Sequence, residues 1–175
     1  MDQPDKIFDR ALYVSRQDRA RRTGPDFLAR TAAEEVLGRL LLVTRSFDRA
    51  LIVAPAPAVV ADRLGTSGKL REIVPQLPSA AENLDLEPAG FDAVFSILDL
   101  HAVNDVPGAL VQYRRALRPD GLFTACLFAG ASLTELRQSW LEAEAALTGG
   151  ASPRVAPMID VRELGSLLQR AGFAL

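Results

Sequence analysis

The residues best suited to chemistry in this sequence follow an apolar run at positions 91–98. Asp99, His101 and Asp105 come after it, and His101 is the only histidine of the chain. Ligands of open α/β sheets bind outside the carboxyl ends of the strands, so Asp99 and His101 are candidate binding residues, and Asp105 is a candidate helix cap. A structural histidine is the alternative. The three side chains could also hold a cation weakly, but a lone histidine excludes a two-histidine iron site within this chain.

A second group of candidate residues forms the connection after the apolar run 49–54. Nucleotide-binding α/β folds place glycines in this turn, because glycine lets the backbone approach the cofactor closely. Here no glycine is present, and prolines at positions 55 and 57 fix the backbone and remove two N–H donors. We therefore predict a strand-to-helix connection without a ligand. The stretch consists of Val53, Ala54, Pro55, Ala56, Pro57 and Ala58.

Acidic side chains that could accept hydrogen bonds from a ribose are sparse in the next segment. The stretch Val74-Pro75-Gln76 offers none at the end of the second predicted strand. Glu72 lies nearby, but the alternation of side chains along a strand predicts that it points elsewhere. A second cofactor contact is therefore expected to be missing.

The elements that position these residues are predicted from hydrophobic periodicity and from helix-capping residues. Two helices come first, followed by alternating strands and helices, which is typical of a parallel sheet with helices on both faces. We expect an N-terminal helical extension at 1–45 and one α/β domain at 46–175, with at most one degraded strand–helix unit at 77–88. The expected helices cover 5–22, 27–44, 56–64, 104–117 (capped by Asn104), 133–147 (capped by Ser132) and 161–170 (capped by Asp160), and the expected strands cover 49–54, 69–74, 91–98 and 122–128, with a turn at 119–121.

The first predicted helix differs from the others because its apolar face is thin. Its mixed charges favour a solvated surface, and docking to an acidic protein partner is the alternative. We therefore expect this helix to be partly mobile or bound to a partner, whereas the helix at 27–44 is expected to pack on the sheet. Trp140 and Leu141 belong to an apolar stripe that is predicted to lie in the core. The basic residues of the first helix are Arg10, Arg16, Arg19, Arg21 and Arg22.

Several segments together resemble class I S-adenosylmethionine (SAM)-dependent methyltransferases. The stretch from Phe91-Asp92-Ala93-Val94 through residues 101–105 to the turn Leu117-Arg118-Pro119-Asp120-Gly121 is similar to the region between the fourth and fifth strands of that superfamily. Residues 8–11, 136–138, 142–144 and 149–154 resemble one branch more narrowly. That branch contains the alphaproteobacterial relatives of complex I assembly factor 5, a methyltransferase-fold protein associated with arginine hydroxylation, with the BioC-type methyltransferases of biotin synthesis as more distant relatives.

The resemblance implies a reduced Rossmann-like domain whose ancestor bound SAM. The family pattern D-x-G-x-G is absent, and its acidic position is taken by Ile52 or Val53. Glu82 stands in the stretch that resembles the adenine-contacting segment of relatives. The vestigial cofactor-binding positions implied in this way are Val53, Ala54, Pro55, Ala56, Glu82, Asp99 and His101.

The resemblance also predicts an open sheet edge. Complete class I methyltransferases end in a hairpin that covers the fifth strand, and this chain stops at Leu175, where the hairpin would begin. Residues 122–128, from Leu122 to Phe128, would then form an apolar edge strand, which is a template for another chain. We expect self-association through this edge as a two-fold dimer, or capture of a strand from a protein partner.

Composition narrows the class of protein further. A formal net charge of −2 argues against a general nucleic-acid binder, and the single cysteine, Cys126, excludes an intrachain disulfide and any multi-cysteine metal site. The longest apolar stretch, 50–61, is too short to cross a membrane. The N-terminal segment lacks an apolar signal core. These features favour a cytoplasmic protein of one domain, without membrane insertion, and the resemblance to alphaproteobacterial proteins implies a bacterial source.

These losses together predict a noncatalytic binding or assembly module that holds no cofactor. Each loss removes an independent contact to SAM, and no catalytic residue is identified. One alternative is an active SAM-dependent methyltransferase with an atypical cofactor loop. Another is a protein that binds a different small molecule in the cleft where the ancestral methyltransferase would have held SAM. Pro55 and Pro57 are the residues that discriminate among these hypotheses.

Overall fold

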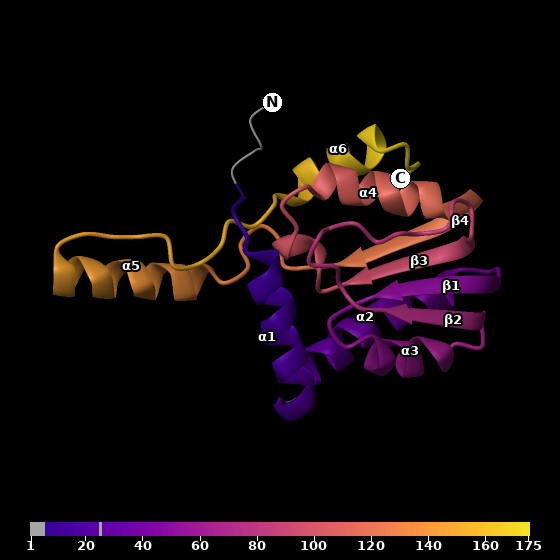
Figure 1. Ribbon diagram of the computed structural model, residues 1–175, viewed down its shortest axis with the longest axis horizontal. Helices are drawn as coiled ribbons and strands as arrows, with labels where there is room; N and C mark the ends of the chain where they lie inside the picture. Colours follow the sequence, from indigo (N-terminus) through magenta and orange to yellow (C-terminus); the bar gives the residue numbers. More distant parts are fainter. Residues whose placement is uncertain (1–5, 25) are drawn as a thin grey trace.

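Four parallel strands form the centre of the protein (Figure 1). In the computed structural model, which describes residues 6–24 and 26–175, the strand order is β2-β1-β3-β4, so β2 and β4 are the edges. The predicted α/β class is confirmed, since helices alternate with strands that pair in parallel. The elements are α1 (Arg10–Thr23), α2 (Phe27–Leu42), β1 (Phe47–Val53), α3 (Pro57–Gly65), β2 (Leu70–Gln76), β3 (Phe91–Ile97), the 3-10 helix η1 (Leu100–Ala102), α4 (Val106–Ala116), β4 (Leu117–Cys126), α5 (Thr134–Thr148) and α6 (Val161–Arg170).

The central strands β1 and β3 are apolar because both of their faces are covered. Successive side chains alternate across a strand, so Leu51 and Val53 pack on one face and Ile52 on the other. α2 and α3 cover the face that carries Ile52 and Phe95, and α4 and α6 cover the opposite face (Figure 1). The sheet is therefore the middle of three layers, and its strand ends form the rim on which a ligand site would be built.

The helix predicted at 27–44 packs on the sheet as expected. Val36, Leu37 and Leu40 of α2 are buried together with Phe95 of β3. Their helical spacing places them on one stripe, which is the stripe that the periodicity indicates. The helix ends at Leu42, slightly before the predicted end.

The turn predicted at 119–121 lies inside β4 as an irregular bulge. Phe91 pairs with Leu117, but Ala93 pairs with Leu122, so β4 carries extra residues between the two pairs. Asp120 has a left-handed φ of 61° at this point. Because an extra stretch in one strand is absorbed as a bulge rather than by breaking the ladder, the strand begins at Leu117 instead of at residue 122, and it ends at Cys126 rather than at residue 128.

Of the predicted helix caps, Asn104 and Ser132 are wrong, whereas Asp105 and Asp160 are confirmed. Asp105, rather than Asn104, caps α4 by accepting from Gly108 N at 2.8 Å, because Asn104 is engaged in long-range bonds at the site. The Ser132 hydroxyl donates to Ala129 O, so it does not cap α5. Asp160 does cap α6, accepting from Arg162 N at 2.8 Å.

The prediction that Trp140 and Leu141 lie in the core is wrong. α5 extends away from the sheet (Figure 1), none of its residues is buried, and the two side chains are 46% and 42% exposed. The segment 151–158 returns along α5, where Glu144 bonds to Ser152 and Arg154. Periodicity identifies an apolar stripe but not the surface that covers it, which is why the sequence pattern misleads here.

The connection between β2 and β3 holds no further strand or helix. Residues 77–90 are turns and irregular backbone, so the degraded strand–helix unit predicted at 77–88 is absent. None of the helices within 6–24 and 26–175 has both the length and the apolarity that a membrane span needs. The division of the chain at residue 45 stays a prediction.

Candidate functional site

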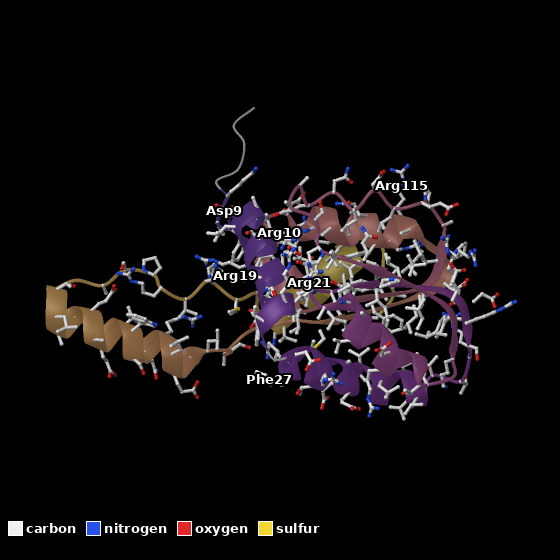
Figure 2. The ribbon with its side chains drawn as sticks, turned by 60° about the horizontal axis from the view of Figure 1, so that its bottom comes forward. Asp9, Arg10, Arg19, Arg21, Phe27 and Arg115 are labelled. Carbon is white, nitrogen blue, oxygen red and sulfur yellow. The ribbon has the colours of Figure 1, made fainter. Side chains whose placement is uncertain are left out.

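The candidate site is the rim formed at the carboxyl ends of the parallel strands, where open α/β sheets bind their ligands. The rim consists of the β1–α3 connection, the segment 77–90, the segment 98–105 and the start of α1, and we call it the strand-end cleft after that position in the fold. Figure 2 shows Asp9 and Arg10 at the start of α1, close to this end of the sheet. Each contributing segment is held by a different contact, and these contacts determine what the cleft can bind.

The β1–α3 connection is closely packed and poor in donors. Val53 and Ala54 are 0% and 1% exposed, and Ala54 N donates to Gln76 O at 3.2 Å. Ala56 caps α3 without a side-chain hydrogen bond, and Pro57 occupies the first turn of that helix. A proline there leaves one N–H fewer at the helix N-terminus, which is where folds of this kind bind phosphates and other anions.

Arg10 fills the centre of the strand-end cleft. Its Nη1 donates to Asp99 Oδ1 at 2.8 Å and to Ala102 O at 3.2 Å, and its Nη2 donates to Ser79 O at 3.1 Å. The side chains of Arg10 and Asp99 are only 4% and 3% exposed. Burial raises the pKa of Asp99, and the Arg10 guanidinium opposes that rise. The prediction that Arg10 belongs to a solvated face is therefore wrong.

The Glu82 carboxylate, on the same rim, accepts hydrogen bonds from Asn104 and Asp105. It accepts from Asn104 N at 2.9 Å, from Asn104 Nδ2 at 2.7 Å and from Asp105 N at 3.0 Å. Burial alone would raise the pKa of Glu82, but these donors and the nearby Arg10 guanidinium outweigh burial and lower it. A ribose hydroxyl would have to compete with all of these donors for the carboxylate oxygens.

Four non-glycine residues of the rim segments, Glu82, Asp85, Ala89 and Leu98, adopt left-handed backbone conformations. Leu98 has a φ of 56° and Glu82 a φ of 58°, a region that is unfavourable for residues with a Cβ. Such strain persists only where the surroundings hold it, and it is concentrated at functional sites. At Leu98 the surroundings include the Tyr13 hydroxyl, which donates to Leu98 O at 2.9 Å.

His101 lies beside the cleft as a partly buried aromatic residue. Its ring meets Phe128 edge-on with centroids 4.9 Å apart. Burial, together with the positive charge of Arg10, lowers the pKa of His101 to about 4. The imidazole is therefore neutral at neutral pH, and its buried Nδ1 has no hydrogen-bond partner among the described residues. These features favour a structural histidine over a general base poised near pH 7.

The structure thus brings together only some of the residues singled out from the sequence. Asp99 and Glu82 share the Arg10 network, whereas Glu72 points away, bonded to Arg49 at 3.3 Å. Arg10, Tyr13 and Asn104 were missed, because a helix of mixed charge predicts solvent exposure and their partners lie far away in sequence. Within the described ranges, no three His, Cys, Asp or Glu side chains converge as a metal site.

Two cavities lie away from the strand-end cleft. One of about 720 Å³ is an open hollow between α5 and the segment 151–158, with Arg137 and Trp140 in its wall. The other, of about 380 Å³, lies between β4 and the C-terminal residues, with Arg114 and Phe123 in its wall. Neither cavity is lined by Arg10, Asp99 or Glu82.

The parallel sheet with helices on both faces defines a Rossmann-like α/β domain. Residues 41–125 match the family described as "Methyltransferase domain". A SAM-dependent methyltransferase of Thermotoga maritima has the same fold, with a TM-score of 0.51 and 19% identity over 97% of this chain and 81% of that one. The chain belongs to the class I methyltransferase superfamily.

Sequence relatives place the chain within one branch of that superfamily. The mouse protein "Arginine-hydroxylase NDUFAF5, mitochondrial" is 34% identical over 95% of this chain and 55% of its own length. The malonyl-[acyl-carrier protein] O-methyltransferase of Xylella fastidiosa is 34% identical over 53% of this chain and 30% of its own length. The branch is therefore the one expected from the sequence, and the chain spans about half the length of the NDUFAF5 proteins.

Proposed function

We propose that this chain is a methyltransferase-fold protein that no longer binds SAM and that acts as a noncatalytic binding or assembly module. The observation that carries the proposal is the β1–α3 connection. There Pro55 and Pro57 replace the glycines that a cofactor-binding turn needs, and Ala54 is fully packed. No backbone donor is available at either proline, so a nucleotide would find a surface of side chains in place of N–H groups.

The acids of the cleft support the same proposal. Asp99 is paired with the Arg10 guanidinium, and Glu82 accepts bonds from Asn104 and Asp105. A ligand hydroxyl would compete for Asp99 Oδ1 and for the Glu82 oxygens with charge-assisted or backbone bonds, and charge-assisted bonds are the stronger ones. Both acids of the cleft are therefore already engaged by donors of the protein itself.

An active methyltransferase with an atypical cofactor loop is the second candidate. The observation that favours it is the match of residues 41–125 to the methyltransferase domain family. In that case SAM would be the cofactor, and the backbone of Ala54–Ala56 would have to lie close to it although this stretch contains no glycine.

We further propose that the module works through protein contacts, by β4 self-association or by capture of a partner strand. β4 is a sheet edge, and its segment 122–126 contains no proline and no charged residue to discourage pairing. The assembly role itself comes from the resemblance to complex I assembly factor 5, and the cytoplasmic location stays a prediction.

The experiment is a titration of the chain with SAM and with S-adenosylhomocysteine, followed by thermal shift and by calorimetry. The proposal expects no saturable heat and no change in melting temperature. A ligand at 100 times its dissociation constant would stabilise the fold by about 2.7 kcal/mol, which is readily detected. A class I methyltransferase with an intact glycine turn serves as the positive control. Saturable binding to this chain would overturn the proposal in favour of the active enzyme.

A further inference from the structure

We propose that two copies of this chain pair antiparallel along β4, about a two-fold axis at Thr124, so that their two sheets join into one. The inference rests on the proposed function in one respect, namely that β4 works by association. It goes further because it selects a second copy of the chain over a foreign strand, and because it states which residues meet at the contact.

The first observation is the direction in which the backbone groups of β4 point. Cys126 O accepts a hydrogen bond from Leu98 N at 2.7 Å, so the backbone groups of Cys126 point towards β3. Successive residues of a strand turn their N–H and C=O groups to opposite sides. The groups of Thr124 therefore also point towards β3, and those of Phe123 and Ala125 point outward. No strand among the described residues pairs with them, since β4 is an edge of the sheet (Figure 1).

A second copy of β4 fits these outward groups in one register. The free segment runs from the end of the bulge at residue 122 to the end of the strand at Cys126, so Thr124 is its centre. With the axis at Thr124, Phe123 lies opposite Ala125 of the second copy, and the two residues exchange both of their hydrogen bonds. The two Thr124 residues form the pair without hydrogen bonds, with Cα atoms about 4.5 Å apart. All outward groups of the segment are then satisfied.

The second observation is that the side chains of β4 are those of a strand with neighbours on both sides. Residues 121–126 are half-buried, although the segment 122–126 is apolar apart from Thr124. Beside Phe123 lies the hollow of about 380 Å³, with Leu168 and Phe173 also in its wall. A strand added to β4 runs past this hollow, and its apolar side chains would remove the wall from water. Such burial is the main driving force of association.

The third observation selects a second copy over a foreign strand. Arg39 and Glu35 of α2 act in opposite directions on the pKa of the Cys126 thiol, which burial raises, so both charges lie beside β4. Their side chains are 67% and 66% exposed. A two-fold axis perpendicular to the sheet places α2 of the second copy antiparallel on the same face. Arg39 of each copy then faces the Glu35 side of the other, and symmetry supplies the complementary charges that a foreign strand would need to carry.

Disulfide cross-linking tests the register. All variants carry Cys126→Ser, so that the introduced cysteine is the only one of the chain. Thr124→Cys should give mostly covalent dimer on mild oxidation, because the paired Cα atoms lie within the range of roughly 4.4–6.8 Å that a disulfide spans. Ala125→Cys is the matched control. Its two cysteines are offset along the strands, with Cα atoms more than about 7 Å apart, and should stay mostly unlinked. Any result other than preferential linking of Thr124→Cys would overturn the proposal.

Charge exchange on α2 is a second test, which leaves β4 intact if the cysteine variants do not fold. Glu35→Arg and Arg39→Glu should each dimerise less than the wild type in light scattering at low salt, because each places like charges across the axis. An equimolar mixture of the two should recover the dimer. Arg63→Glu is the control, since Arg63 pairs with Glu34 on the α3 side of the helix, and it should dimerise as the wild type does. A mixture no better than its components would overturn the choice of a second copy.

Two further measurements separate this inference from the proposed function. A wild-type chain that dimerises in light scattering, without linking at position 124, would overturn the register and leave the association of β4 standing. A wild-type chain that stays monomeric would overturn both. Titration of the linked Thr124→Cys dimer with S-adenosylhomocysteine concerns the cofactor alone: saturable heat would overturn the loss of cofactor binding and leave the pairing intact, and the absence of heat would support both.

Discussion

Arg10 and Asp99 are separated by 89 positions in the chain, yet Arg10 Nη1 lies 2.8 Å from Asp99 Oδ1 in a buried environment. This pair joins the first helix to the end of the central strand β3. It does so at the place where other members of the superfamily would be expected to leave room for a nucleotide. The predictions below concern this pair, its neighbour His101, the open edge of the sheet and the extended helix α5.

Asp99→Asn should destabilise the fold strongly. It would leave the Arg10 guanidinium buried beside a neutral group, and removing one partner of a buried ion pair costs about 3–5 kcal/mol. Urea unfolding measures the change in free energy. The double variant Arg10→Met with Asp99→Asn should cost less than the sum of the two single variants. Additive costs would show that the two residues are not coupled.

The stability of the chain should fall as the pH is lowered from about 6.5 to about 4, partly because of His101. Its folded pKa is about 4, against about 6.5 for an unperturbed histidine, so the unfolded chain binds the proton first. The full difference corresponds to at most about 3 kcal/mol. Thermal unfolding of wild type and His101→Gln across this range measures it. Parallel curves for the two proteins would contradict the assignment.

Lysine at position 124 should prevent association through β4. Phe123 is unsuitable for this test because its ring stacks on Tyr113 and lies against Phe173, and Leu127 packs against the same side of the sheet. Thr124 is a partly buried polar residue of β4. Light scattering should show concentration-dependent dimers for the wild type and monomers for Thr124→Lys. A wild-type chain that stays monomeric at high concentration, without a retained partner, would refute the edge contact.

Trp140 should fluoresce as a solvent-exposed indole. It is the only tryptophan of the chain, and its side chain is 46% exposed on α5. Iodide and acrylamide should therefore both quench its emission in the native protein, and Leu141→Ser should leave the melting temperature nearly unchanged. Emission at short wavelength with poor quenching would mean that α5 is covered, by a second copy or by a partner.

Particular residues show how far the sequence alone determined this protein. The apolar runs of β1 and β3 indicate strands buried on both faces, because a parallel sheet leaves neither face to solvent. Val36 and Leu40 mark the buried stripe of α2, and Asp160 marks the start of α6. The absence of glycine around Pro55 is equally visible, since it depends only on residue type. These features are local, and local patterns are what a sequence shows directly.

Tertiary structure alone decided the role of Arg10 and the exposure of Trp140. The helix that carries Arg10 has mixed charges and a thin apolar face, which predicts a solvated position. The acceptors of Arg10, however, come from Ser79, Asp99 and Ala102 far along the chain. Trp140 lies in an apolar stripe, but the stripe meets no other part of the sheet. In both cases the deciding contact, or its absence, lies between distant segments. Periodicity reports which face of a helix is apolar, and only the fold determines what that face meets.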